Sequence, residues 1–155
     1  MARLFLFQRW NETRRMTQDA VVLKSAVFIR RGGQILVFRH PSAGVQLPKG
    51  TVEPGETLED AARREVFEEV RLTLSGPLTR IGVWDCPSPK STWHVFVADA
   101  PVGTAEAWRH APSGGGEEAG LLLDVFWIEM SAARDLMHPL FLPVIDIMEQ
   151  YIRSE

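Results

Sequence analysis

GTVEPGETLEDAARREVFEEVR, residues Gly50 to Arg71, is the most informative stretch of the chain. Glu68 and Glu69 follow Glu65 at spacings of three and four residues, so on an α-helix the three carboxylates share one side. Like charges at these spacings repel one another and weaken a helix unless a cation lies among them. A hard divalent cation, Mg²⁺ or Mn²⁺, is the simplest such partner, because carboxylate oxygens are its preferred ligands.

The residues around the carboxylates predict a loop followed by a helix. The run from Lys49 to Glu56 contains two glycines and a proline, which is typical of a loop with special backbone angles. Thr57 begins a capping-box pattern, and the helix is expected to continue to about Arg71. Val66 and Val70 would point into the protein, which places the three carboxylates at the rim of the buried face.

An acidic run of this kind also has a plainer interpretation. Most such runs form a solvated helix face with a few surface ion pairs, and exposed pairs contribute little stability. Here Arg64 lies one turn before Glu68 and could brace it, or reach back to Glu56 in a rigid two-bond fork. The carbonyl of Gly50, near the start of the helix, would add a peptide oxygen to the carboxylates. The joined loop and helix therefore favour an all-oxygen cation site over a solvated face.

This segment resembles the signature of the Nudix hydrolases: Gly, five residues, Glu, seven residues, Arg-Glu, an aliphatic, any residue, Glu-Glu, any residue, Gly, an aliphatic. The matching residues are Gly50, Glu56, Arg64, Glu65, Val66, Glu68, Glu69 and Leu72. The departure is Arg71, where the family usually has glycine. We expect an altered helix C-cap there and not lost chemistry. The preceding residues, Leu47-Pro48-Lys49, are similar to those of family members in which the signature opens with Leu-Pro-Lys-Gly.

The resemblance implies an α+β fold, namely the α/β/α sandwich of the family with a mixed central sheet, as a single domain over residues 1–155. It also implies metal-dependent hydrolysis of a nucleoside diphosphate linked to another group, with Mg²⁺ or Mn²⁺ as cofactor. By position, the metal-binding and catalytic residues would be Glu65, Glu68 and Glu69, with the carbonyl of Gly50 as a further ligand. Glu56 and Arg64 would mainly brace the loop against the helix.

Further site residues are predicted outside the helix. Glu118, which with Glu117 follows three consecutive glycines, is a candidate general base or extra metal ligand. Lys49 is a candidate for steadying a phosphate, Arg39 for a substrate contact, and Trp108 for stacking on a base. Each of these residues also has a plainer interpretation as an exposed or loop residue.

The remaining sequence predicts a sheet with helices on both faces. Runs rich in β-branched residues predict strands over residues 20–30, 34–39, 78–86, 92–99 and 121–129. Residues 101–120 are expected to form a long loop, Ser131 to cap a short helix, and residues 140–153 to form a closing helix. Within the extension 1–19, Arg3 to Gln8 are predicted as an extra edge strand, which could serve a homodimer.

Composition narrows the functional classes. The net charge of −3 argues against broad attraction to nucleic acid or to a membrane surface, although an acidic metal site can still take an anionic substrate. Cys86 is the only cysteine, so no internal disulfide can form and a cytoplasmic location is the default. No run in the sequence approaches the roughly 20 apolar residues that a membrane-spanning helix needs.

Three functional hypotheses remain open at this point. The leading one is a metal-dependent pyrophosphohydrolase acting on a nucleotide-containing small molecule, with dinucleoside polyphosphates as the first substrate class. Its rival within the enzymes is a house-cleaning hydrolase of nucleoside triphosphates. A sensor that binds nucleotides without turnover is the third, and the presence of all the signature glutamates argues against it.

Overall fold

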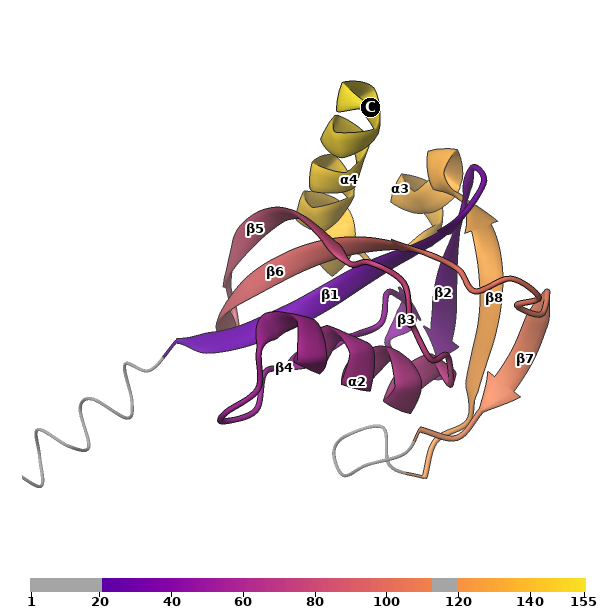
Figure 1. Cartoon of the computed structure of the whole chain (residues 1–155), viewed down its shortest axis with the longest axis horizontal. Helices are drawn as coiled ribbons and strands as arrows, with labels where there is room; N and C mark the ends of the chain where they lie inside the picture. The colour runs from indigo at the N-terminus through magenta and orange to yellow at the C-terminus, as the bar shows by residue number, and fades with distance from the viewer. Residues whose placement is uncertain (1–20, 113–119) are drawn as a thin grey trace, which may run out of the picture.

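The structure is a computed structural model that describes residues 21–112 and 120–155. Its strands are β1 (Val22–Arg31), β2 (Gln34–His40), β3 (Gly44–Gln46), β4 (Lys49–Thr51), β5 (Thr79–Pro87), β6 (Lys90–Asp99), β7 (Ala107–His110) and β8 (Leu123–Glu129). Its α-helices are α2 (Leu58–Val70), α3 (Ala133–Leu136) and α4 (Leu142–Ser154), as Figure 1 shows. Two short 3-10 helices, Met130–Ala132 and Pro139–Phe141, flank α3.

The strands form one mixed sheet in the order β5-β6-β1-β2-β8-β7. Strands β1 and β6 run parallel, whereas the other pairs are antiparallel. Strands β1 and β2 pair only at their hairpin end, through Arg30 with Ile35 and Arg31 with Gln34. The rest of that edge of β1 is therefore open to β4, where Gly50 pairs with Ser25. This arrangement brings the start of the signature into the sheet.

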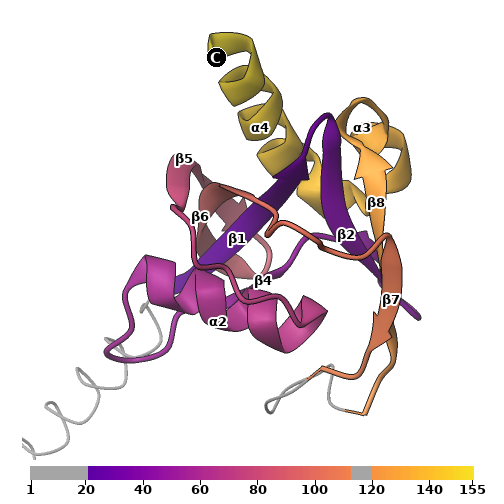
Figure 2. The same ribbon diagram turned by 45° about the vertical axis from the view of Figure 1, so that its right-hand side comes forward.

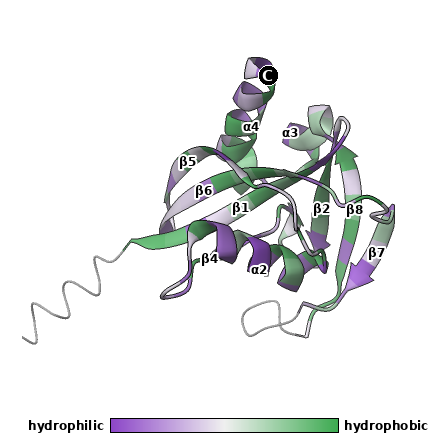
Figure 3. Ribbon diagram, in the orientation of Figure 1, coloured by the Kyte–Doolittle hydropathy of each residue, from purple (hydrophilic) through white to green (hydrophobic). Residues whose placement is uncertain are grey.

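Each face of the sheet is covered by a different helix, as Figures 1 and 2 show. Helix α2 packs Val66 and Val70 against one face, in a core cluster that includes Phe38 and Phe96. Helix α4 packs against the other face, in a cluster that includes Trp93. The hydropathy colours in Figure 3 alternate along α2, as expected for a helix with one buried side. The predicted mixed sheet with helices on both faces is confirmed.

The loop prediction for Lys49 to Glu56 is wrong at its start, because β4 is a strand paired with β1. Gly50 does not have the positive φ that was expected of this loop, whereas Gly55 does, at 82°. The prediction missed β4 because a three-residue strand is defined by the edge it meets and shows no periodicity of its own.

Two further predictions are corrected by the structure. The expected loop over 101–120 contains β7, which pairs with β8. Ser131 does not cap a helix: it lies inside the 3-10 helix that begins at Met130, and no side chain caps that helix. The edge strand predicted over Arg3 to Gln8 falls outside the described residues. No helix within the described ranges is both long and apolar enough to cross a membrane.

Candidate active site

Helix α2 presents its three carboxylates at the edge of the buried face. Thr57 caps the helix, because its hydroxyl accepts a hydrogen bond from the backbone N–H of Asp60 at 3.0 Å. Val66 is fully buried and fixes the rotation of the helix against the sheet. The side chains of Glu65 and Glu68 are 14% and 25% exposed, which leaves both within reach of a ligand from solvent. Glu69 is buried. This agrees with the prediction that the carboxylates lie at the rim of the buried face.

Strand β4 lies directly against these carboxylates. The backbone N–H of Lys49 donates to Oε1 of Glu69 at 2.9 Å. A Cβ atom built on Gly50 would overlap the carboxylate of Glu65, so any larger residue would push that carboxylate out of its present position. Gly50 therefore matters through the space that it leaves to the Glu65 carboxylate and not through its backbone conformation. This close approach brings a peptide group of β4 beside a carboxylate of α2.

Arg64 joins the loop, β4 and the carboxylates. Its Nε and Nη2 donate to the two oxygens of Glu56, each at 2.8 Å, so the predicted fork is present. Its Nη1 lies 2.8 Å from Oε1 of Glu65 and 3.2 Å from Oε2 of Glu68. Nη2 also donates to the carbonyl of Thr51 at 3.0 Å. One guanidinium thus ties the loop to the helix and offsets part of the repulsion between two glutamates.

This contact also changes the acidity of the brace. The hydrogen bond from Arg64 lowers the pKa of Glu56 from 4.5 to about 2, and the backbone N–H of Glu53 adds to the effect. The same fork raises the pKa of Arg64 above its ordinary value. The pair is therefore fully charged across the physiological pH range.

The donor atoms on this side of α2 fit a hard divalent cation, because they are carboxylate oxygens with the backbone of β4 beside them. Gly50 supports this fit, since any larger residue would fill the space between β4 and Glu65. Among residues 21–112 and 120–155, no three acidic, histidine or cysteine side chains already stand in a metal-binding arrangement. Arg64 Nη1 bridges two of the three glutamates instead, so a bound cation would compete with it for their oxygens.

The other predicted site residues are spread more widely. Lys49 lies on β4, the strand that adjoins the carboxylates, and its ammonium is 5.3 Å from the ring centroid of Trp93. Arg39 lies on β2, with its guanidinium 5.3 Å from the ring centroid of Phe126. Glu118 lies outside the described residues. The structure therefore brings the backbone N–H of Lys49 to Glu69, sets its ammonium beside Trp93, and shows no contact between Arg39 and the carboxylates.

Trp108 and His110 contact the end of α2 from β7. Trp108 Nε1 donates to the carbonyl of Val70 at 2.9 Å, and His110 Nε2 lies 2.6 Å from the carbonyl of Glu68. The sequence interpretation placed both residues in a loop and missed these contacts. Their spacing of two residues puts both side chains on the same face of β7, but a strand of four residues is too short for this spacing to be recognised as a pattern in the sequence.

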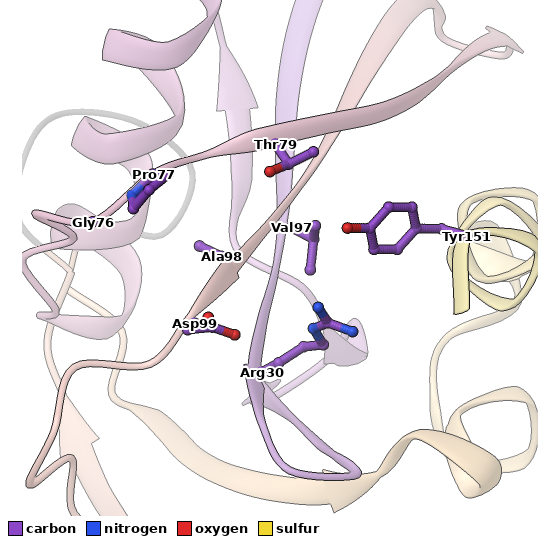
Figure 4. Close-up of a pocket in the computed structure, with 8 residues that line it drawn as sticks. All are labelled: Arg30, Gly76, Pro77, Thr79, Val97, Ala98, Asp99 and Tyr151. Atoms are coloured by element: carbon purple, nitrogen blue, oxygen red, sulfur yellow. The ribbon is translucent and has the colours of Figure 1, made fainter. Parts of the chain in front are cut away.

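A separate hollow of about 280 Å³ lies between the sheet and the end of α4, as Figure 4 shows. Arg30, Thr79, Asp99 and Tyr151 are among its lining residues, and Arg30 forms an ion pair with Glu155 at 2.5 Å. Arg30 follows Ser25, the partner of Gly50, by five residues on β1, which is roughly 16 Å along the strand. The hollow is therefore distinct from the carboxylate site.

A mixed sheet between two helices, with a glutamate-bearing helix braced to its preceding loop by an arginine, defines the Nudix class of α+β domains. The chain belongs to the Nudix hydrolases, a family of pyrophosphohydrolases: the model of the NUDIX domain matches residues 22–145. The family resemblance and the fold class predicted from the sequence are thus confirmed.

Individual relatives share this domain. The NAD-capped RNA hydrolase NudC of Edwardsiella ictaluri is 41% identical over 80 residues, which cover 50% of this chain and 31% of the relative. A Bacillus subtilis protein named provisionally as an 8-oxo-dGTP diphosphatase is 34% identical over 108 residues, covering 68% of this chain and 64% of the relative. The chain spans about a third of the length of the NudC proteins that it matches.

Solved structures also share the fold. A NUDIX hydrolase from Nitrosomonas europaea superposes with a TM-score of 0.63 at 19% sequence identity, over 88% of this chain and 73% of the other. At this identity the likeness speaks for the fold alone.

Proposed function

We propose that this chain hydrolyses a phosphoanhydride bond in a nucleoside diphosphate derivative, with Mg²⁺ or Mn²⁺ held by Glu65, Glu68, Glu69 and the carbonyl of Gly50. The observation that carries the proposal is the contact between β4 and α2, where the absence of a side chain at Gly50 makes room for the carboxylate of Glu65. Membership of the Nudix hydrolases supports the same reaction class.

When bound, the cation would supply charge neutralisation on the phosphate oxygens and a water of lowered pKa. The residues of the chain have separate tasks around it. The carboxylates of α2 provide the ligands, and Arg64 with Glu56 keeps the loop fixed against the helix. Lys49, beside Gly50 on β4, would steady a phosphate of the substrate. Glu118 remains our candidate general base, because hydrolysis needs a group that takes a proton from the attacking water.

The first substrate class that we propose is a pair of nucleosides joined through phosphates, such as a dinucleoside polyphosphate. NudC, the NAD-capped RNA hydrolase, supports it, because NAD is itself two nucleosides joined by a pyrophosphate. That relative also makes a nucleic-acid substrate a candidate, although the net charge of −3 favours a small molecule. The second class is a nucleoside triphosphate, which the Bacillus subtilis relative favours.

The test is a panel of dinucleoside polyphosphates, NAD, NAD-capped RNA and nucleoside triphosphates, incubated with Mg²⁺ or Mn²⁺ and analysed by product mass. Glu68→Gln and Glu69→Gln should each lower turnover by roughly a hundredfold or more, because each removes a ligand charge. Glu59→Gln is the matched control, since Glu59 is exposed in the first turn of the same helix. Full activity in both ligand variants would remove the metal-site proposal.

Three broader properties are part of the proposal. Residues 1–155 would form one domain, Trp108 and Arg39 would contact the substrate, and the protein would act in the cytoplasm. The buried, unpaired thiol of Cys86 is consistent with a reducing compartment. A homodimer through the N-terminal extension would show as a concentration-dependent mass in analytical ultracentrifugation.

A further inference from the structure

The last turn of α2 carries two of the proposed ligands, Glu68 and Glu69, at the place where a helix is least stable. The last four carbonyls of an α-helix have no partner within the helix and must be satisfied from outside. Arg71 covers one of them, because its backbone N–H donates to the carbonyl of Phe67 at 3.0 Å. Arg71 does so with φ at 61°, a conformation that glycine usually provides. The backbone cap is therefore a strained one.

Two side chains of β7 supply further donors. His110 Nε2 lies 2.6 Å from the carbonyl of Glu68, and Trp108 Nε1 lies 2.9 Å from that of Val70. A carbonyl oxygen only accepts hydrogen bonds, so Nε2 of His110 must carry the hydrogen. Three of the last four carbonyls of α2 are thus satisfied, two of them by rings from a strand that is 38 and 42 residues away in sequence.

The strand that holds these rings is itself well anchored. Trp108 pairs with Val125 and His110 with Leu123 on β8, and both partners are buried. Trp108 also packs against the core cluster beneath α2. Strand β7, beside the end of α2 in Figure 2, thus fixes the two N–H donors relative to the sheet.

We propose that Trp108 and His110 are positioning residues for the metal site. By holding the carbonyls of Val70 and Glu68, they keep the last turn of α2 helical, and this fixes the spacing between the carboxylates of Glu68 and Glu69. The inference rests on the proposed function, because it assigns the contacts a role in metal affinity. It also gives Trp108 a role that does not require stacking on a base.

The experiment measures Mn²⁺ affinity by electron paramagnetic resonance for four variants of the full chain. Trp108→Phe keeps an aromatic ring and removes the indole N–H. His110→Ala removes the imidazole and with it the Nε2–H donor. Both should weaken Mn²⁺ binding by roughly tenfold, the loss typical of groups that orient metal ligands. His110→Gln should restore most of the affinity, because its amide N–H can reach the same carbonyl. Trp127→Phe is the matched control, since Trp127 packs on the same core cluster but its Nε1 donates to the carbonyl of Ala105 at 3.0 Å and not to a carbonyl of α2.

Amide hydrogen exchange in the apo protein separates the two ways to fail. The amides of the last turn of α2 could exchange as slowly in Trp108→Phe and His110→Ala as in the wild type and Trp127→Phe. In that case the contacts from β7 do not stabilise the last turn. If these amides exchange faster in the two variants but the Mn²⁺ affinity is unchanged, the contacts from β7 have no role in metal binding. Both results overturn the inference. A wild-type protein that binds no Mn²⁺ would instead overturn the proposed function, and this inference with it.

Discussion

Gly50 is the residue where the requirement for a particular amino acid is clearest. A Cβ atom there would occupy the space of the Glu65 carboxylate, so Gly50→Ala must displace Glu65 or move β4 away from α2. The displaced atoms are the far end of a flexible side chain, so the cost in stability should be small. Displacing a ligand by about 1 Å can cost roughly a hundredfold in rate. We expect turnover to fall far more than the melting temperature, as measured by a steady-state assay beside calorimetry.

The control for that variant is Gly76→Ala. Gly76 has open space around its Cβ position and no positive φ, so alanine should be accepted there with activity unchanged. Equal activity in the two variants would show that the contact between Gly50 and Glu65 has no functional importance.

Arg71 differs from the family signature and still adopts the conformation that glycine would have. An αL conformation costs a residue with a side chain about 1–2 kcal/mol. The guanidinium recovers part of this cost by lying 4.6 Å from the ring centroid of Phe67. Arg71→Gly relieves the strain but loses this contact, so the free energy of unfolding should change by less than about 1 kcal/mol. Urea denaturation would measure it, and a large loss of catalysis would reveal a role for Arg71 beyond the cap.

The brace between the loop and α2 makes a prediction about pH. The pKa of Glu56 falls from 4.5 to about 2 on folding, so its contribution to stability is present above about pH 4.5. That contribution is lost as the pH falls toward 2, because the folded state must then take up the proton. Glu56→Gln should lower the unfolding free energy by roughly 1–2 kcal/mol near pH 7, and by progressively less below about pH 4.5. Chemical denaturation at a series of pH values would show the two curves converging.

Glu106→Gln provides the comparison for this pH series. Glu106 also pairs with an arginine, Arg31, at 2.9 Å, but its side chain is 85% exposed. Exposed pairs contribute little, so the stability of this variant should follow that of the wild type throughout. Parallel curves for Glu56→Gln and the wild type would contradict the structural role of the fork.

The longer elements could be predicted from the sequence, whereas the short strands β4 and β7 could not. Helix α2 shows its cap and its buried stripe at Thr57, Val66 and Val70 in the sequence itself. Strands β4 and β7 have three and four residues, too few for a periodic pattern, and each exists because a partner strand offers it an edge. Both carry groups that contact the carboxylate helix, which is why part of the site was missed.

At the scale of the whole molecule, the sheet separates two packing layers with different consequences for function. The signature revealed the acidic side of α2 because the spacing of the glutamates is local in sequence. It did not reveal that Gly50 packs on Glu65 or that β7 reaches the end of α2, because these contacts depend on how distant segments meet. The site is thus a property of the α2 layer and the strands beside it.

Matched valines in the two layers test this separation. Val66 on α2 and Val144 on α4 are both fully buried, and they pack on opposite faces of the sheet. Either Val→Ala substitution should lower the unfolding free energy by about 2 kcal/mol, because each removes two buried carbons and leaves a small cavity. Only Val66→Ala should also weaken Mn²⁺ binding, since it loosens the helix that carries the carboxylates. Urea denaturation and Mn²⁺ titration of both variants would measure the two effects. Equal loss of Mn²⁺ affinity in both would mean that the metal site depends on the whole sandwich and not on the α2 layer.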